Sequence, residues 1–412
     1  MDPRARTVYR VDVRSFFDSD ADGLGDINGV AAKIDYIKEI GADTLMLSPV
    51  LMPGDYAVDP EIGTADALDA LIDRAAARMI GTVLEMPVDM RLNDDDAMER
   101  AAAAMRYWLD RGVMGIAVNT DALTARGDKR ALHRAMHALN RSVFSLYPDC
   151  FTVGTGKSVP FEDAVQLTRT ENRELLMQLY TPAHMAEAFS PAPVGLGALF
   201  GGGDAKRFRH GADYHQVQGE LRGGWFLNGI SLAQGQYSSR NELMRRLRSK
   251  AACLFAMTGR GTPLIHQGDE IGLYAPNMPM QWNNSRAAGF TLGTPKIKGD
   301  GALSHINVEE DMTHMDSVCA FYKRAIELRR SHSALIYGEY APVDSENAHV
   351  TAYSRSDGAE SLLIVINITD RAARVALDGC KKGECLLYTN SPKPVAEIMK
   401  LQPYEGFVYR LR

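Results

Sequence analysis

Apolar and β-branched residues gather in short runs, separated by longer stretches of helical period, from the N-terminus to about residue 335. This alternation is typical of β-α-β units, in which helices that cover the sheet join parallel strands. Eight runs have the composition of strands, and they are residues 8–17, 43–50, 82–88, 115–120, 150–155, 174–180, 224–231 and 262–267. Because eight parallel strands close on themselves, the pattern predicts an α/β fold of the (β/α)₈ TIM-barrel type.

The pattern changes near residue 341. Beyond it, apolar and polar residues alternate with a period of two, and turn residues recur about every eight to twelve positions. Such alternation is typical of antiparallel strands with one buried face. The sequence therefore predicts two domains, a barrel over residues 1–340 and an antiparallel β-sandwich over residues 341–412.

Composition narrows the classes of partner. The 412 residues carry a net charge of −6 and include no long apolar run, so neither nucleic acid nor a membrane is an expected partner. The N-terminus lacks the apolar stretch of a signal peptide. Five cysteines, an odd number without metal-ligand spacing, favour a reducing compartment. We therefore expect a cytoplasmic protein.

Several segments keep an order of motifs along nearly the whole chain. They are VYRVDVRSFF with its continuation to residue 50, DPEIGT at 59–64, MRYWLDRGVMG at 105–115, GTPLIHQGDEIG at 261–272, MPMQWNNSRAAGFT at 278–291, INVEE at 306–310 and residues 317–340. This set resembles the oligo-1,6-glucosidase and α-glucosidase branch of the α-amylase family of glycoside hydrolases. The resemblance implies a retaining mechanism with an Asp nucleophile on strand 4, a Glu acid on strand 5 and a supporting Asp on strand 7. The first two carboxyl groups then lie about 5 Å apart.

The family positions on strands 4 and 5 carry other residues here. Where the family writes Gly-Phe-Arg-x-Asp, this chain has Ala117 for the Arg and Asn119 for the nucleophile. An amide has no negative charge with which to form a glycosyl ester. Thr155 stands at the position of the acid, and a hydroxyl is too weak an acid to donate its proton near neutral pH.

Two further strand ends also depart from the family. Ile230 and Ser231 replace the His and Asp of strand 7, and Met90 replaces a His after strand 3. The insert that usually follows strand 3 is reduced to about residues 91–96, and the loop after strand 2 lacks a Tyr-Asp pair of the family. We therefore predict no catalytic residue at the family positions, and hence a degenerate family member.

Acids elsewhere in the chain offer a relocated pair. Asp121 follows Asn119 by two residues, and Glu171 and Glu174 lie near strand 6. Asp121 would project about 6–7 Å further along the strand, and no matching acid stands close to it in the sequence. Glu85 and Asp89 on strand 3 are expected to make structural hydrogen bonds.

An acidic segment follows the first strand. Its carboxylates alternate around glycines, which lets the chain curl about a hard cation that takes six to eight oxygen ligands. The segment resembles a calcium loop of the same family branch. By that resemblance Asp18, Asp20, Asp22 and Asp26 ligate a structural Ca²⁺ through their side chains and Leu24 through its carbonyl.

Three functions are consistent with these features. The first is a non-enzymatic carbohydrate-binding or regulatory protein of carbohydrate metabolism, whose partner is an oligosaccharide or another protein. The second is an α-glycosidase or transglycosylase that acts on α-glucosides with relocated acids. The third is a purely structural assembly protein. On the sequence alone, we expect the first.

Overall fold

The structure is a computed structural model. It describes residues 2–87, 95–119, 129–155, 161–168, 177–179, 212–213, 216–217, 219, 224–229, 242–273, 278–299, 305–377, 379 and 382–411.

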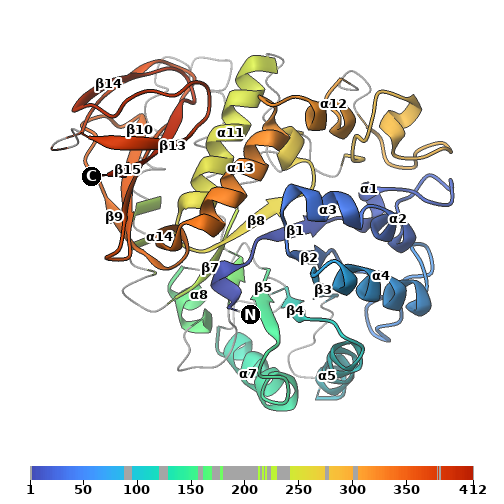
Figure 1. The fold of residues 1–412 in the computed structure, drawn as a ribbon. Coiled ribbons are helices and arrows are strands. Elements are labelled where there is room, and N and C mark those ends of the chain that lie inside the picture. The colour runs from blue at the N-terminus through green and yellow to red at the C-terminus, as the bar shows by residue number, and fades with distance from the viewer. Residues whose placement is uncertain are drawn as a thin grey trace, which may run out of the picture.

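Eight parallel strands form a closed barrel in chain order (Figure 1). Strand β1 closes the barrel by pairing with both β2 and β8. The strands are β1 (Val8–Val11), β2 (Thr44–Leu47), β3 (Gly81–Met86), β4 (Gly115–Val118), β5 (Phe151–Gly154), β6 (Met177–Leu179), β7 (Phe226–Asn228) and β8 (Thr262–His266). The parallel sheet agrees with the predicted (β/α)₈ architecture, and each strand falls within or next to one of the eight predicted runs.

The first predicted run divides into a strand and a helix. Strand β1 ends at Val11, and helix α1 spans Val13–Phe16. Val13 and Phe16 are buried at a helical spacing of three residues, and the N–H of Ser15 donates to the carbonyl of Asp12 at 3.1 Å. A run of apolar residues satisfies either period over so short a length, so packing selects the helix.

Helices surround the barrel (Figure 1). Helix α4 begins where the Thr64 hydroxyl accepts from the N–H of Ala67, and α13 where Ser317 caps in the same way. Both are N-caps of the common Ser/Thr type. The longer helices are α2 (Ile27–Ala32), α3 (Ile34–Ile40), α4 (Ala65–Ala77), α5 (Asp95–Asp110), α7 (Lys129–Leu139), α8 (Phe161–Thr168), α11 (Glu242–Thr258) and α13 (Val318–Ser331). The short ones are α12 (Val308–Thr313), α14 (Ser333–Tyr337) and the π-helix η2 (Asn140–Phe144).

Side chains fill the barrel in layers. The odd strands contribute Val8, Val83, Val153 and Leu227, and the even strands contribute Met46, Ala117 and Leu264. These side chains belong to one buried apolar cluster. Alternate strands supply alternate layers in barrels of this type, so the lower interior is a packed core without a pore.

Antiparallel strands form the C-terminal part of the chain. The first sheet has the order β13-β15-β11-β10-β9 and the second pairs β12 with β14. An apolar cluster joins them, with Val350, Val365 and Tyr409 from the first sheet and Val375 and Leu401 from the second. The strands are β9 (Glu339–Pro342), β10 (Val350–Ser356), β11 (Ser361–Asn367), β12 (Ala373–Ala376), β13 (Gly383–Tyr388), β14 (Ile398–Leu401) and β15 (Gly406–Leu411). A domain boundary at residue 340 stays a prediction.

Two buried arginines, Arg329 of α13 and Arg355 of β10, bond the end of α11, which lies beside the C-terminal sheet in Figure 1. Arg329 donates to the carbonyls of Met257, Leu335 and Gly261 at 2.6–2.9 Å. Arg355 donates to the carbonyl of Thr258 at 2.7 Å. Both arginines thereby supply donors and positive charge at the C-terminal end of α11, where helix carbonyls lack partners. Burial lowers the pKa of Arg329 to about 9.

Candidate functional site

The carboxyl ends of the barrel strands form one face, here called the barrel mouth. Enzymes with this fold carry their active sites on this face. Because inward side chains alternate along a strand, the layer above Val8, Val83 and Val153 contains Arg10, Glu85 and Thr155. The fourth odd strand contributes Gly229 and hence no side chain. The apolar core therefore ends in a polar layer, and this layer forms the floor of the barrel mouth.

Glu85 is the centre of this layer. It is 5% exposed, and its Oε2 pairs with Nη2 of Arg10 at 2.6 Å. Its Oε1 accepts a hydrogen bond from the Thr155 hydroxyl at 3.0 Å. The arrangement is an ion pair between a buried carboxylate and a partly exposed arginine, with the neutral Thr155 hydroxyl bonded to the other carboxylate oxygen. These contacts are structural hydrogen bonds of the kind expected for Glu85.

The arginine that pairs with Glu85 does not come from strand 4. Ala117 lies directly beside Glu85 in the register of β3 and β4, and it offers no polar group. The cation comes instead from Arg10 on β1, across the barrel interior.

Val11 pairs with Leu47 and Leu47 with Leu84, so Asp12, Ser48 and Glu85 are the next residues in the register of three neighbouring strands. Asp12 lies just beyond the end of β1, two residues after Arg10. Its N–H donates to Oε1 of Gln267 at 2.9 Å, while its carboxylate has no hydrogen bond or ion pair with the described residues. The sequence did not single out Asp12.

The predicted degenerate positions are only partly described. Thr155 extends the β4–β5 ladder through its N–H and bonds Glu85, and Asn119 follows β4 with partial exposure. The other positions named from the sequence lie outside the described residues, and they are Met90, Ile230, Ser231, Asp89, Asp121, Glu171 and Glu174.

Three of the four predicted calcium carboxylates converge. One oxygen of each of Asp18, Asp20 and Asp22 lies within 4.8 Å of the others. Asp26 is directed elsewhere, because it caps α2 through the N–H of Gly29 and binds the N–H and hydroxyl of Ser19, each at 2.7 Å. The charge and oxygen donors of the trio suit a hard cation, whereas Asp26 does not join them.

A lysine from the segment after β8 already forms an ion pair with this acidic loop. Nζ of Lys296 bonds Oδ2 of Asp22 at 2.7 Å, which lowers the pKa of Asp22 and raises that of Lys296. Burial acts to raise the pKa of Asp18, but hydrogen bonds from Thr291 and three backbone N–H groups bring it below its ordinary value. The loop is therefore held by direct hydrogen bonds as well as by any metal.

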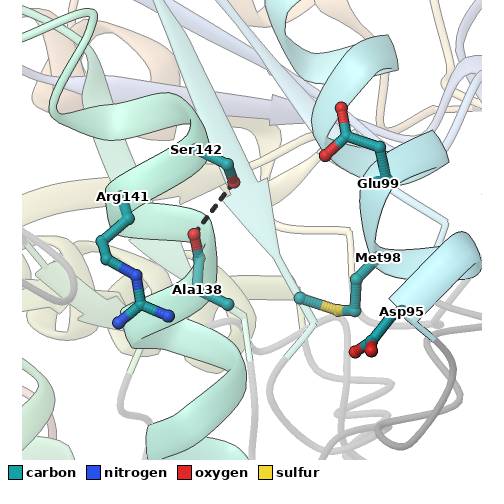
Figure 2. Close-up of a pocket in the computed structure, with 6 residues that line it drawn as sticks. All are labelled: Asp95, Met98, Glu99, Ala138, Arg141 and Ser142. Atoms are coloured by element: carbon teal, nitrogen blue, oxygen red, sulfur yellow. Dashed lines mark hydrogen bonds between the residues drawn. The ribbon is translucent and has the colours of Figure 1, made fainter.

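A hollow of about 310 Å³ lies outside the barrel between α5 and the α7–η2 segment (Figure 2). Asp95, Met98 and Glu99 line one side, and Ala138, Arg141 and Ser142 line the other. The Ser142 hydroxyl donates to the carbonyl of Ala138 at 2.9 Å, and Asp95, Glu99 and Arg141 are exposed. The exposed charges indicate a groove on the surface of the protein, and nothing in its lining points to a reaction.

Comparisons with known proteins agree with the fold. Residues 11–93 and 83–338 match the model of the α-amylase catalytic domain. An oligo-1,6-glucosidase of Parageobacillus thermoglucosidasius is 24% identical over 557 aligned positions, which cover 98% of each chain. A trehalose-6-phosphate hydrolase of Bacillus subtilis (strain 168) is 23% identical with the same coverage. A solved structure of the Bacillus licheniformis trehalose-6-phosphate hydrolase matches with a TM-score of 0.87 at 21% identity, covering 99% of each chain.

These relatives overturn one expectation from the sequence. The prediction of a non-enzymatic carbohydrate-binding or regulatory protein is wrong, because the proteins that align with nearly the entire chain are glycoside hydrolases. The comparisons favour the alternative, an α-glycosidase. Among the described residues, no helix is long and apolar enough to cross a membrane.

Proposed function

This chain belongs to the α-amylase family, and from that premise we propose that it acts on α-glucosides as a glycosidase or transglycosylase. The relatives named above support the substrate class, since their names give 1,6-linked glucosides or trehalose 6-phosphate as substrate. The barrel mouth supports the location of the reaction, since it has a polar floor in a barrel that is otherwise apolar.

We propose further that the reaction uses no carboxylate at the family positions. Asn119 and Thr155 carry side chains that cannot ionise to a carboxylate, and Ser231 has the same limitation. Hydrolysis of a glycoside with this geometry needs a pair of carboxyl groups, so the acids must stand elsewhere. The observation that carries this proposal is Glu85, a buried carboxylate in an ion pair with Arg10 at the mouth.

The length of the chain supports a more open mouth than that of the relatives. The alignment with the oligo-1,6-glucosidase runs over 557 positions, whereas this chain has 412 residues, so the relative carries segments that are missing here. We propose that one of them is the insert after strand 3. A wider mouth favours oligosaccharides over a single disaccharide as substrates.

An activity screen tests the proposed function. Purified protein is incubated with nitrophenyl α-glucoside, maltose, isomaltose, a maltodextrin and trehalose 6-phosphate, and released glucose or nitrophenol is measured. We expect turnover of at least one substrate above that of a mock preparation from the same host. Absence of turnover by protein with a cooperative thermal transition would reject the proposal.

We also propose that the trio Asp18, Asp20 and Asp22 binds a structural Ca²⁺, with the carbonyl of Leu24 as a further ligand that the family resemblance suggests, whereas Asp26, which bonds Ser19 and Gly29, is not a ligand. The convergence of three carboxylates supports it. Bound calcium would tie the loop after β1 to itself, without a part in the chemistry.

A cytoplasmic location is the remaining proposal. The four cysteines within the described residues, Cys150, Cys253, Cys319 and Cys385, carry free thiols. Burial raises the pKa of Cys150 and Cys319 to about 12, so these thiols are unreactive at neutral pH. Fractionation of cells of the source organism, with detection by antibody, tests the location.

A further inference from the structure

We propose that Met312 is a modification site, at which hydrogen peroxide forms a methionine sulfoxide whose oxygen is bound by Cys319 and Lys323. Met312 lies near the end of α12, and its two partners lie on α13. The proposal is independent of the glycosidase activity proposed above, since it assigns none of these residues a part in that reaction.

Two hydrogen-bond donors approach the sulfur of Met312. The thiol of Cys319 donates to Sδ of Met312 at 3.3 Å, and Nζ of Lys323 donates to the same sulfur at 3.8 Å. A thioether is only a weak acceptor, so both donors are poorly satisfied by the unmodified side chain. Oxidation places a polar oxygen on one of the sulfur lone pairs, which are the groups that accept these bonds. The sulfoxide oxygen is therefore formed next to donors that are already in place.

Lys323 is held beside Met312 by a second partner. Its Nζ donates to Oε1 of Glu39 on α3 at 2.7 Å. An ammonium group has three N–H donors, so the bond to Glu39 leaves donors for Met312. Hydrogen bonds from a charged donor are stronger than those between neutral groups. Lys323 therefore contributes more than Cys319 to binding of the sulfoxide.

Met312, and not Cys319, is the residue that peroxide oxidises first. Met312 is partly exposed, whereas Cys319 is buried. Burial raises the pKa of the Cys319 thiol to about 12, so almost none of the reactive thiolate is present at neutral pH. A thioether needs no ionisation to react.

The modification transfers one oxygen atom. The O–O bond of hydrogen peroxide breaks, one oxygen forms the bond to Sδ of Met312, and the other leaves with both hydrogens as water. The sulfur loses two electrons and the peroxide gains them, while Cys319 and Lys323 keep their protons. Sulfoxide reductases restore methionine, so the modification is reversible.

The sulfoxide strengthens a connection between two helices that are neighbours in Figure 1, α12 and α13. At the start of α12, the N–H groups of Val308 and Glu309 donate to the carbonyls of Gln281 and Trp282, each at 2.9 Å. Helix α12 thus links the segment after β8 to α13. Methionine oxidation usually disrupts packing because it puts a polar group among apolar side chains. At Met312 we expect the opposite sign, since the new oxygen has donors.

Thermal unfolding before and after oxidation tests the proposal. Wild type and Met312→Leu are treated with dilute hydrogen peroxide, and peptide mass mapping measures the oxidation of each methionine. The change in melting temperature on oxidation should be more positive for the wild type than for Met312→Leu, by about 2 °C or more. Met315→Leu is the matched control from the same connection. Met315 is 90% exposed, so this variant should respond to oxidation as the wild type does.

Lys323→Leu tests the role of the cation. It keeps Met312 but removes the charged donor, so its melting temperature should change on oxidation as that of Met312→Leu does. A measurement without substitutions supports the same point. Acetylation of Lys323 by an amine-reactive reagent, followed by mass mapping, should be slower in the oxidised wild type than in the reduced protein.

Two results would overturn the proposal. One is a change in melting temperature of the wild type that is equal to that of Met312→Leu or more negative. The other is a Met312 that stays unmodified in the folded protein under conditions that oxidise Met315. Neither result depends on whether the protein hydrolyses an α-glucoside, so the proposed function is tested separately.

Discussion

At the scale of single residues, the ion pair of Arg10 and Glu85 shows how two charges are accommodated inside a barrel. Each partner offsets the desolvation of the other, and Thr155 satisfies the second carboxylate oxygen. Nε of Arg10 is buried and has no hydrogen-bond partner among the described residues. The stability of this arrangement therefore depends on both members of the ion pair being present.

The ion pair predicts that removing one charge destabilises the protein more than removing both. Arg10→Met leaves the Glu85 carboxylate buried without a cation, and we expect the free energy of unfolding to fall by about 3–5 kcal/mol. Adding Glu85→Met removes the orphaned charge, so the double variant should recover most of that loss. Urea unfolding followed by circular dichroism measures both. A double variant less stable than Arg10→Met would show that the charge is not the cause.

A second buried carboxylate lies on the loop after β8. Glu270 is fully buried and accepts from the hydroxyls of Tyr9 and Tyr36 at 2.7 and 2.8 Å. Burial raises its pKa from 4.5 to about 7, although the tyrosine hydrogen bonds act in the opposite direction. The folded state therefore holds a proton that the unfolded state has released between about pH 4.5 and 7.

Glu270 thus predicts a pH dependence. Since the folded state binds more protons in this window, the contribution of Glu270 to stability falls as pH rises from about 4.5 through 7 and is lost above it. Glu270→Gln has no such titration, so its stability relative to the wild type should increase from pH 5 to pH 8, by at most a few kcal/mol. Thermal unfolding at both pH values measures the change, with the exposed Glu309→Gln as control. An unchanged difference between pH 5 and 8 would exclude Glu270 as the titrating group.

At the scale of elements, the acidic loop after β1 shows how a segment is fixed by partners that are remote in sequence. Asp18 accepts from Thr291 and Asp22 from Lys296, and both partners lie in the segment after β8. Gly23 adopts a φ of +94°, and a Cβ there would approach the carbonyl oxygen of Thr294 to 2.1 Å. Glycine is thus required where the two segments meet.

Lys296 makes the calcium proposal testable on this element. If Ca²⁺ binds Asp18, Asp20 and Asp22, Lys296 competes with it for Asp22. We expect Ca²⁺ to raise the melting temperature of the wild type, and to raise that of Lys296→Met further, with a gain of about 1–3 kcal/mol when calcium is well above its dissociation constant. Scanning calorimetry with calcium and with chelator measures this, and Lys298→Met is the control from the same exposed loop. No response of either protein to calcium counts against the site.

At the scale of the whole molecule, the C-terminal sheet is joined to the barrel helices by charged donors and main-chain acceptors. Arg355 bonds the carbonyls of Thr258 and Gly338 at 2.7 and 3.0 Å, and the hydroxyls of Tyr353 and Thr258 lie 2.6 Å apart. Arg329 occupies the same region from α13. The end of α11 is thereby completed by residues of both parts of the chain.

This connection predicts that replacing Arg355 by a residue of similar volume strongly lowers the free energy of unfolding. Arg355→Met leaves two buried carbonyls without donors, and we expect a loss of about 3 kcal/mol of unfolding free energy. Urea unfolding measures the loss, and Arg374→Met, an exposed arginine of the same C-terminal part, is the control. Equal stability of the two variants would mean that solvent replaces Arg355.

The sequence by itself determined the barrel, the order of its strands and the antiparallel C-terminal strands. Each follows from the period of apolar residues over short stretches, such as the alternation around Val83 and Glu85, and that period reports a local conformation. The loss of carboxylates at positions 119 and 155 could also be read from the sequence. It could not be extended to function, because a vacant position in a motif does not reveal which other acids face the mouth.

Only the tertiary structure decided which of these residues meet. Glu85 lies 75 residues from Arg10 and 70 from Thr155 in the chain, and barrel closure and strand register bring them into contact. A segment remote in sequence likewise brings Lys296 to Asp22, while Asp26 caps α2. Periodicity tells which face of a strand a side chain occupies. Its partner across the barrel depends on register and closure, which are properties of the whole fold.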